Sequence, residues 1–233
     1  MTSSIAQTSD QLRQRLQDVR ARIELAARRS QRDPAAIRLI AVSKTHPAAV
    51  VRQAIDAGVA DLGENRVQEA ETKIAELGRE RARWHLIGHL QSNKARRAVQ
   101  LFDMIHSLDS GALARKLDQA CHEEDRELLP VLIQVALGHE ATKSGVEERE
   151  LPAVVDAVTN SKRLQLAGLM TLPPFFEEAE LARPYFASLR ALRDKLRAQG
   201  SFGKAPGELS MGMTHDFEVA IAEGATMVRV GTA

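Results

Sequence analysis

Eight short strand-like segments alternate with amphipathic segments along most of this sequence. The strand-like segments are apolar, and they fall at about residues 38–44, 60–63, 84–88, 103–108, 130–136, 164–170, 208–210 and 227–230. In the segments between them apolar residues recur with the spacing of a helix. This alternation predicts an α/β protein in which helices cover a parallel sheet.

Two architectures satisfy such a pattern, an open doubly wound sheet and a closed barrel. Eight strands with short, even connections favour a (β/α)8 TIM barrel, and 233 residues suit one barrel domain. We therefore predict a single domain over residues 1–233, with the barrel at about 37–233. An extra helix at about 9–30 is predicted to precede it, with Leu12, Leu16, Val19 and Ile23 on one face.

Composition limits the partners and the cellular location that we expect for this protein. The net charge is +1 and aromatic residues make up 3 %, so the sequence lacks both the field and the stacking groups of a nucleic-acid binder. Cys121 is the single cysteine, which excludes an intramolecular disulfide. The N-terminus has no apolar secretory segment. We expect a soluble cytoplasmic protein with neither nucleic acid nor membrane as a partner.

Polar residues stand at the ends of the predicted strands, where parallel barrels carry their chemistry. Lys44 shares the inward face of the first strand with Ile40 and Val42. Apolar surroundings would favour the neutral amine, which can attack a carbonyl carbon. The alternative is a lysine that extends from a strand end into solvent. The residues alone leave both explanations open.

The ends of the last two strands suggest an anion site. Barrels often bind phosphate with these loops, and here they carry Ser210-Met-Gly and Gly231-Thr232. The two hydroxyls can donate hydrogen bonds, and a helix predicted to begin near Thr214 would add its positive end. The alternative is an ordinary turn followed by a helix cap.

Arg229 is predicted to face into the barrel together with Met227 and Gly231. A guanidinium group only donates hydrogen bonds, so an inward Arg229 needs an acceptor. A phosphate oxygen or a ring nitrogen would serve, and so would the carboxylate of a structural salt bridge.

Seven segments together resemble the pyridoxal-phosphate homeostasis proteins, relatives of the N-terminal barrel of alanine racemase. In family order they are Ala41-Val-Ser-Lys44-Thr, Gly63-Glu-Asn65, Trp84-His-Leu-Ile-Gly88 with Leu90-Gln-Ser-Asn-Lys94, Glu140-Ala-Thr-Lys-Ser-Gly145, Gly168-Leu-Met-Thr-Leu-Pro-Pro174, Ser210-Met-Gly-Met213 with Asp216, and Val228-Arg-Val-Gly231.

The resemblance implies that Lys44 holds pyridoxal 5′-phosphate (PLP) as a Schiff base and that Arg229 faces the pyridine nitrogen. It further implies two sets of contacts. The phosphate would be bound by Ser210, Met211, Gly231 and Thr232, and the pocket would be lined by Asn65, His85 and Met170. The sequence departs from the family at Leu62 and Arg66, where aromatic residues are common. We therefore expect an aromatic wall to be absent or replaced.

The same resemblance implies a role in intracellular vitamin B6 homeostasis with little or no turnover. An arginine cannot protonate the pyridine nitrogen, which weakens the ring as an electron sink. A racemase needs an acid or base on each face of the substrate carbon. In alanine racemase a second domain and a dimer partner supply one of them, and the sequence shows no such domain. We expect no catalytic residues, a monomer, and PLP-dependent apo-enzymes as recipients.

Three other functions stay open. A single-domain amino-acid racemase could use His85 or another lysine as a base, and a Schiff-base aldolase would use the barrel lysine without a cofactor. The basic run at Lys94, Arg96 and Arg97 would suit an RNA- or protein-binding module. A metal site is not expected, because His85 and His89 have no third ligand at suitable spacing. Release of PLP could involve Lys94 or Lys143.

Overall fold

The computed structural model describes residues 2–138 and 145–231. The strands are Arg38–Val42 (β1), Asp61–Glu64 (β2), Arg83–Leu86 (β3), Met104–Leu108 (β4), Leu129–Gln134 (β5), Leu164–Met170 (β6), Glu208–Met213 (β7) and Met227–Val230 (β8). The helices are Thr2–Arg29 (α1), Ala48–Asp56 (α2), Val67–Leu77 (α3), Ala95–Leu101 (α4), Gly111–Glu123 (α5), Leu151–Thr159 (α6), Arg183–Ala198 (α7) and Phe217–Ala222 (α8).

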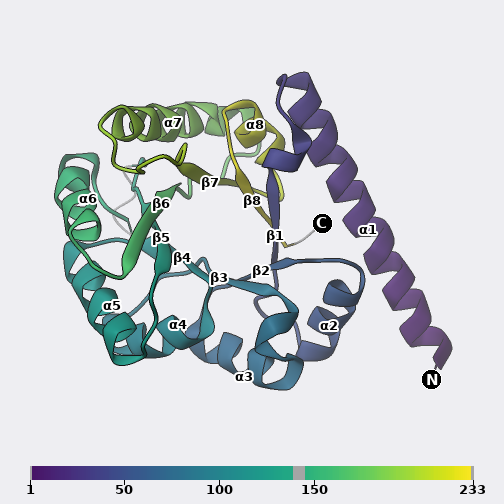
Figure 1. The fold of residues 1–233 in the computed structure, drawn as a ribbon. Helices are drawn as coiled ribbons and strands as arrows, with labels where there is room; N and C mark the ends of the chain where they lie inside the picture. Colours follow the sequence, from purple (N-terminus) through teal and green to yellow (C-terminus); the bar gives the residue numbers. More distant parts are fainter. Residues whose placement is uncertain (1, 139–144, 232–233) are drawn as a thin grey trace.

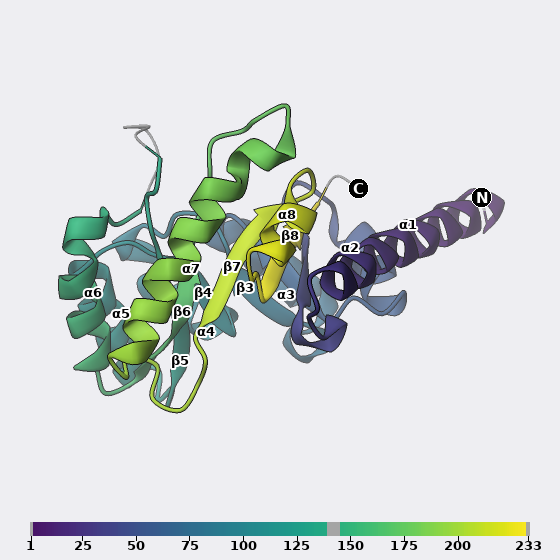
Figure 2. The ribbon, with the colours of Figure 1, turned by 90° about the horizontal axis from the view of Figure 1, so that it is seen from above.

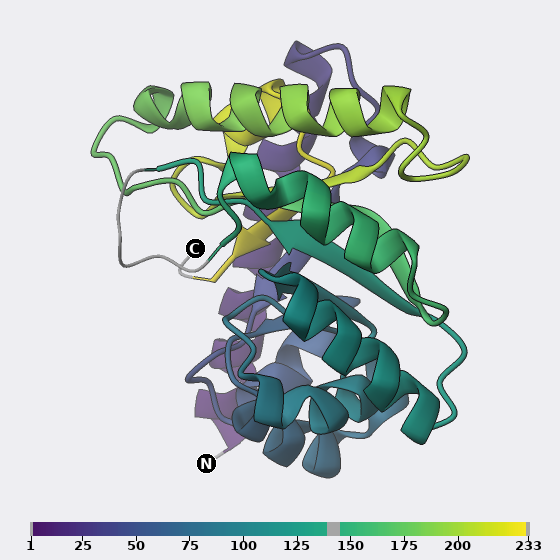
Figure 3. The same ribbon diagram turned by 90° about the vertical axis from the view of Figure 1, so that its left-hand side faces the viewer.

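The strands close into a barrel in sequence order, with β1 paired in parallel to both β2 and β8. Figure 1 views this ring end-on, with the helices around it. In Figure 3 the helices α5, α6 and α7 cover one side of the strands. The (β/α)8 barrel predicted from the sequence is thus confirmed.

Helix α1 completes the outer layer. It lies beside α8 and α2 in Figure 1, at the place where a helix following β8 would cover the barrel. Its buried face includes Val19, Ile23 and Ala27. The predicted extra helix is therefore the eighth helix of the ring. It begins at Thr2 rather than near residue 9, and its N-terminal part projects past α2 in Figure 2.

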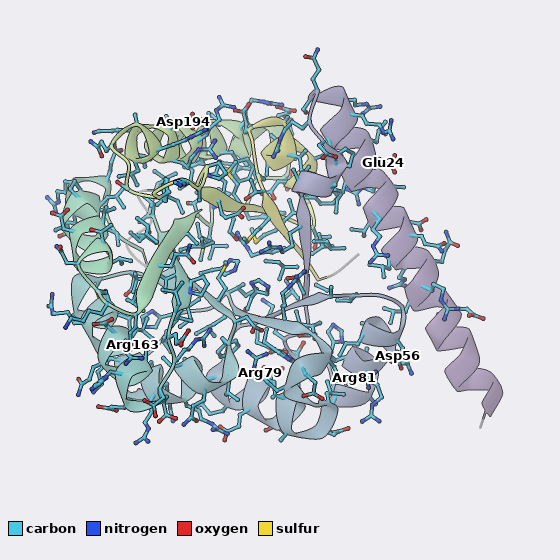
Figure 4. All side chains as sticks on the ribbon, viewed as in Figure 1. Glu24, Asp56, Arg79, Arg81, Arg163 and Asp194 are labelled. Carbon is cyan, nitrogen blue, oxygen red and sulfur yellow. The ribbon has the colours of Figure 1, made fainter. Side chains whose placement is uncertain are left out.

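Side chains fill the inside of the strand ring, whereas the labelled charged residues lie around its outside (Figure 4). One interior cluster is apolar and contains Ile40, Leu132, Met170 and Met227. The rest of the interior is unusual, because buried polar side chains come from β3, β4, β7 and β8. The helices pack on the outer face of the strands through a larger apolar core. Among the described helices, none combines the length and the apolar character needed to cross a bilayer.

The helix predicted to begin near Thr214 starts later, and α3 likewise begins only after an extended stretch of chain. The chain stays extended past Asn65, so that α3 begins at Val67 with Arg66 in the cap position. Thr214 does not cap α8, which begins only at Phe217; its hydroxyl instead accepts a hydrogen bond from the Gly231 amide at 3.2 Å. Both residues are thereby left at the mouth of the barrel.

Candidate functional site

A cavity of about 610 Å³ opens at the carboxyl ends of the strands. The segment between β6 and α7 rises beyond the strand ends beside it (Figure 2). The residues that line the cavity lie at the ends of seven of the eight strands or in the loops that follow them. They include Lys44, Asn65, Gly88, His89, Gln134, Leu172, Phe175, Phe176, Met213, Thr214, His215, Asp216, Arg229 and Gly231. A smaller cavity of about 320 Å³ lies outside the barrel between α1 and α2, with mostly aliphatic walls.

Four residues predicted for the site line this mouth cavity: Lys44, Asn65, Arg229 and Gly231. Ile40 is buried inside the barrel and Val42 lines the cavity, as the alternation along β1 predicts. Lys44 itself is exposed to solvent. We expected apolar surroundings to desolvate the Lys44 amine, but in this structure the side chain is in contact with solvent.

Four other predicted residues lie beneath or behind the cavity instead of lining it. Met170 packs in the apolar interior cluster, and His85 is buried against His106 and Asp61. The Met211 side chain belongs to the outer core because strand alternation turns it away from the interior. The Ser210 hydroxyl is directed into the barrel, where it contacts Arg229 and His106. The side chains of these four residues therefore do not line the cavity in this structure, and the roles expected for them in cofactor binding stay predictions.

Arg229 forms part of the cavity floor and is 3 % exposed. It donates hydrogen bonds from Nη1 to Ser210 Oγ at 2.6 Å and from Nη2 to the Thr171 carbonyl at 2.9 Å. These oxygens are neutral, so the salt bridge considered as an alternative does not account for its position. Burial lowers the pKa of Arg229 to about 10, against the attraction of Asp216. The guanidinium is therefore still charged at neutral pH.

A buried ionic cluster surrounds the backbone on both sides of Lys44. Lys73 Nζ donates to the Ser43 carbonyl at 2.6 Å, to Glu64 Oε1 at 2.7 Å and to Glu69 Oε1 at 2.8 Å. The Ser43 hydroxyl donates to Glu64 at 2.6 Å, and the Thr45 amide donates to Glu69. We call this set, Ser43, Thr45, Glu64, Glu69 and Lys73, the lysine clamp.

The lysine clamp fixes a costly backbone conformation. Thr45 has φ 65°, a left-handed value that β-branched residues rarely adopt. Such a conformation persists only where surrounding contacts determine it. Burial raises the pKa of Glu64 in spite of its hydrogen bonds to Lys73 and Ser43. The clamp thus holds Lys44 in place through its two sequence neighbours.

The ends of β7 and β8 are paired in parallel, and the end of β7 packs closely on α8. Gly212 has φ 91°, and a Cβ atom there would lie 2.6 Å from the Ala220 Cβ. The Met213 amide donates to Asp216 Oδ1 at 2.6 Å, which shapes the turn before α8. Helix α8 has six residues and begins at Phe217, directly after Asp216, which lines the cavity. Thr232 lies outside the described residues.

Sequence reasoning missed the aromatic and histidine residues of the cavity. Phe175 and Phe176 line it from the loop after β6, and Phe175 packs against His215 with ring centres 5.6 Å apart. His89 Nδ1 lies 3.1 Å from Asp109 Oδ2. The adjacent Phe175-Phe176 pair was the signal available in the sequence. Because it lies in a loop, the alternation of side chains along a strand could not predict that its rings line the cavity. The cavity thus has aromatic side chains in its lining, although none stands at positions 62 and 66.

Other candidate features carry less chemistry. No group of three potential ligands for a metal ion occurs in the part of the chain that the structure describes. Burial raises the pKa of Cys121 to about 11, as for an unreactive core thiol. Lys94 lies in the short turn Ser92–Lys94 and does not line the cavity. Lys143 falls outside the described residues.

Comparison with known proteins identifies close relatives. The family model for the alanine racemase N-terminal domain matches residues 14–233. The pyridoxal phosphate homeostasis protein of Aquifex aeolicus is 42 % identical over 219 residues, which cover 94 % of this chain and 95 % of the relative. The PipY protein of Synechococcus elongatus, solved with PLP bound, is 44 % identical with a TM-score of 0.78, covering 92 % of this chain and 98 % of PipY.

A more distant neighbour shares the fold alone. The alanine racemase of Corynebacterium glutamicum is 18 % identical with a TM-score of 0.67, and the match covers 93 % of this chain and 60 % of the racemase.

Proposed function

The chain belongs to the pyridoxal phosphate homeostasis proteins, and we propose that it binds PLP in the mouth cavity as a Schiff base on Lys44. The observation that carries this proposal is the convergence of one exposed lysine, one buried arginine and the closely packed ends of β7 and β8 on a single cavity. The relative PipY, with the same fold, has been solved with PLP bound.

The residues present fit the parts of this cofactor. The Lys44 amine can attack the aldehyde carbon, and the buried Arg229 can donate to the ring nitrogen. We assign the phosphate group to the ends of β7 and β8, with Gly231 and Thr232. In this structure the Gly231 amide donates to Thr214 Oγ1 at 3.2 Å, so phosphate would replace that hydrogen bond. Ser210 and Met211 lie within the paired strand β7, and their expected contact with the phosphate stays a prediction. Asn65 and the Phe175 ring would border the ligand.

We further propose that the protein carries PLP without turnover. Bound PLP supplies an electron sink, and Arg229 weakens it because a charged guanidinium cannot give the ring nitrogen a proton. His89 and His215 line the cavity and are groups that could act as an acid or a base. The Nε2 atom of His215, however, is already engaged by the Glu177 carbonyl at 2.8 Å. A monomer that passes PLP to PLP-dependent apo-enzymes agrees with these features and with the name of the relatives.

A spectroscopic titration tests the binding proposal. PLP added to the protein should produce the absorbance of a protonated Schiff base, whereas Lys44→Ala should show only free cofactor. Lys94→Ala is the matched control, because Lys94 lies outside the cavity and should leave the titration unchanged. An unchanged spectrum in Lys44→Ala would reject the assignment.

The same loaded protein tests the absence of turnover. We expect no conversion of L-alanine to D-alanine above the rate of PLP alone. Conversion that Lys44→Ala abolishes would establish the alternative function, a single-domain racemase.

A further inference from the structure

A row of hydrogen-bonded polar side chains crosses the inside of the barrel. It begins at Arg229 under the mouth cavity and passes to Ser210 at 2.6 Å. From Ser210 Oγ it continues to His106 Nδ1 at 2.9 Å, and from His106 Nε2 to His85 Nδ1 at 3.0 Å. His85 Nε2 lies 2.9 Å from Asp61 Oδ1, which ends the row. We call these five residues the interior relay.

The interior relay is sealed from water along its length. Each of the five residues is at most 3 % exposed, and His106 and Ser210 are fully buried. Its near end, Arg229, borders the mouth cavity, and at its far end the half-exposed Arg83 forms two hydrogen bonds to Asp61 at 2.8 and 2.7 Å. Because these polar atoms are buried, each of them must find its hydrogen-bond partners among neighbouring protein groups.

The chemistry of the two ends fixes the direction of every proton between them. Arg229 can only donate, so the Ser210 oxygen accepts from it and the single Ser210 proton is left for His106 Nδ1. His106 must then carry its proton on Nε2 and donate to His85 Nδ1. His85 in turn carries its proton on Nε2 and donates to the Asp61 carboxylate.

The opposite order is not available. It would require Asp61 to donate and Arg229 to accept, or the Ser210 proton to find an acceptor outside the row. Hydrogen bonds from His85 and Arg83 outweigh the effect of burial and lower the pKa of Asp61 to about 2, which keeps it an acceptor. Burial and the charges of Arg229 and Arg38 hold the pKa of His106 well below its ordinary value.

We propose that Asp61, His85, His106 and Ser210 are positioning residues whose fixed proton order holds the Arg229 guanidinium under the cavity. Nη1 is committed to Ser210 and Nη2 to the Thr171 carbonyl, so the group cannot rotate. One of its remaining N–H groups is then held in a fixed direction, in which it would donate to the ring nitrogen of a pyridine ligand. This last step rests on the proposed function, whereas the proton order rests only on the barrel interior.

Nitrogen NMR of the full chain tests the proton order without any cofactor. Histidine-labelled protein is examined by long-range ¹H–¹⁵N correlation from about pH 6 to 8, where exposed histidines titrate. From the hydrogen-bond geometry we expect both His85 and His106 to carry a proton on Nε2 and none on Nδ1. A charged ring, or a proton on Nδ1 of either residue, would overturn the proposal.

A pair of ligands tests the effect on Arg229. His106→Phe removes both hydrogen bonds of His106 and keeps an aromatic ring. We expect this variant to bind PLP about tenfold more weakly or worse. The reason is that the ring nitrogen would lose its hydrogen bond to the charged Arg229, and such a bond usually has an effect of this size. Binding of the PLP analogue with carbon in place of the ring nitrogen should change by less than about twofold. His106→Gln, which can accept and donate, should restore part of the PLP affinity.

A control variant separates positioning from general damage. Leu132→Ala opens a cavity in the same interior and removes no side-chain hydrogen bond of the relay. It should affect PLP and the analogue equally, and equal losses in His106→Phe as well would show a merely structural role and refute the proposal. If the wild type binds neither ligand on Lys44, the proposed function fails, and the NMR result still decides the proton order.

Discussion

Asp61 shows how a single buried carboxylate can be held ionised by its partners. It accepts from His85 and from two nitrogens of Arg83, and Arg38 lies 3.9 Å away. Burial alone would raise the pKa of Asp61, but the hydrogen bonds lower it to about 2. The folded protein therefore binds a proton at Asp61 less readily than the unfolded chain does.

This difference predicts the pH dependence of an Asp61→Asn variant. Asp61 has an ordinary pKa of about 3.9, so its ionised form contributes about 2 kcal/mol to the free energy of unfolding above about pH 4. The contribution is lost as the pH falls toward about 2. In urea unfolding at several pH values, the gap between wild type and Asp61→Asn should narrow below about pH 4. A gap that stays constant would contradict this assignment.

The lysine clamp makes a second prediction at this scale. Lys73→Met leaves the buried Glu64 without its cation, which should lower the free energy of unfolding by about 3 kcal/mol or more. The backbone at Thr45 should relax and PLP binding should weaken with it. Arg52→Met removes an exposed ion pair to Glu76 and should cost less than about 1 kcal/mol. Equal losses in the two variants would show that the clamp has no special role.

Single residues were predictable where one strand period sufficed. Alternation along β1 and β8 placed Lys44 and Arg229 at the cavity. It did not reveal the lysine clamp or the interior relay, because their members come from different strands and helices. His106 and Ser210 are 104 residues apart in sequence. Only the register of the closed barrel brings such side chains together.

At the scale of elements, the ends of the strands were predicted to within two residues, with one exception at the end of β7. Strand β7 extends to Met213, three residues beyond its predicted end at Ser210. Ser-Met-Gly suggested a turn, but the pairing of β7 with β8 shifts register between Ser210 and Met213 and continues. Gly212, with φ 91°, permits this irregularity.

Gly212→Ala tests that account of β7. The left-handed backbone alone costs about 1 kcal/mol or more for alanine, and the new Cβ would also collide with Ala220. Gly203→Ala is the matched control, because its φ is 60° with no atom within 4 Å of the added carbon. Thermal unfolding should show a clearly larger loss for Gly212→Ala. Similar losses in both would mean that the close packing of β7 on α8 has little importance.

At the scale of the whole molecule, α1 closes the ring of helices. The sequence predicted its apolar face but not that it packs beside α8 and α2, since periodicity identifies a face and not its partner. Ile23 is 6 % exposed on that face, whereas Leu25 is 49 % exposed. Ile23→Ala should therefore lower the free energy of unfolding by about 2–4 kcal/mol, and Leu25→Ala by less than about 1 kcal/mol. Equal effects in denaturant unfolding would show that α1 does not contribute to the barrel core.

The barrel as a whole gathers Lys44, Arg229 and the β7 and β8 ends around one cavity, which is the basis of the proposed PLP site. The most direct test is to load the protein with PLP, reduce it with borohydride and map the adduct by peptide mass spectrometry. Our account predicts one adduct, on Lys44. An adduct missing from Lys44, or spread over surface lysines, would contradict it.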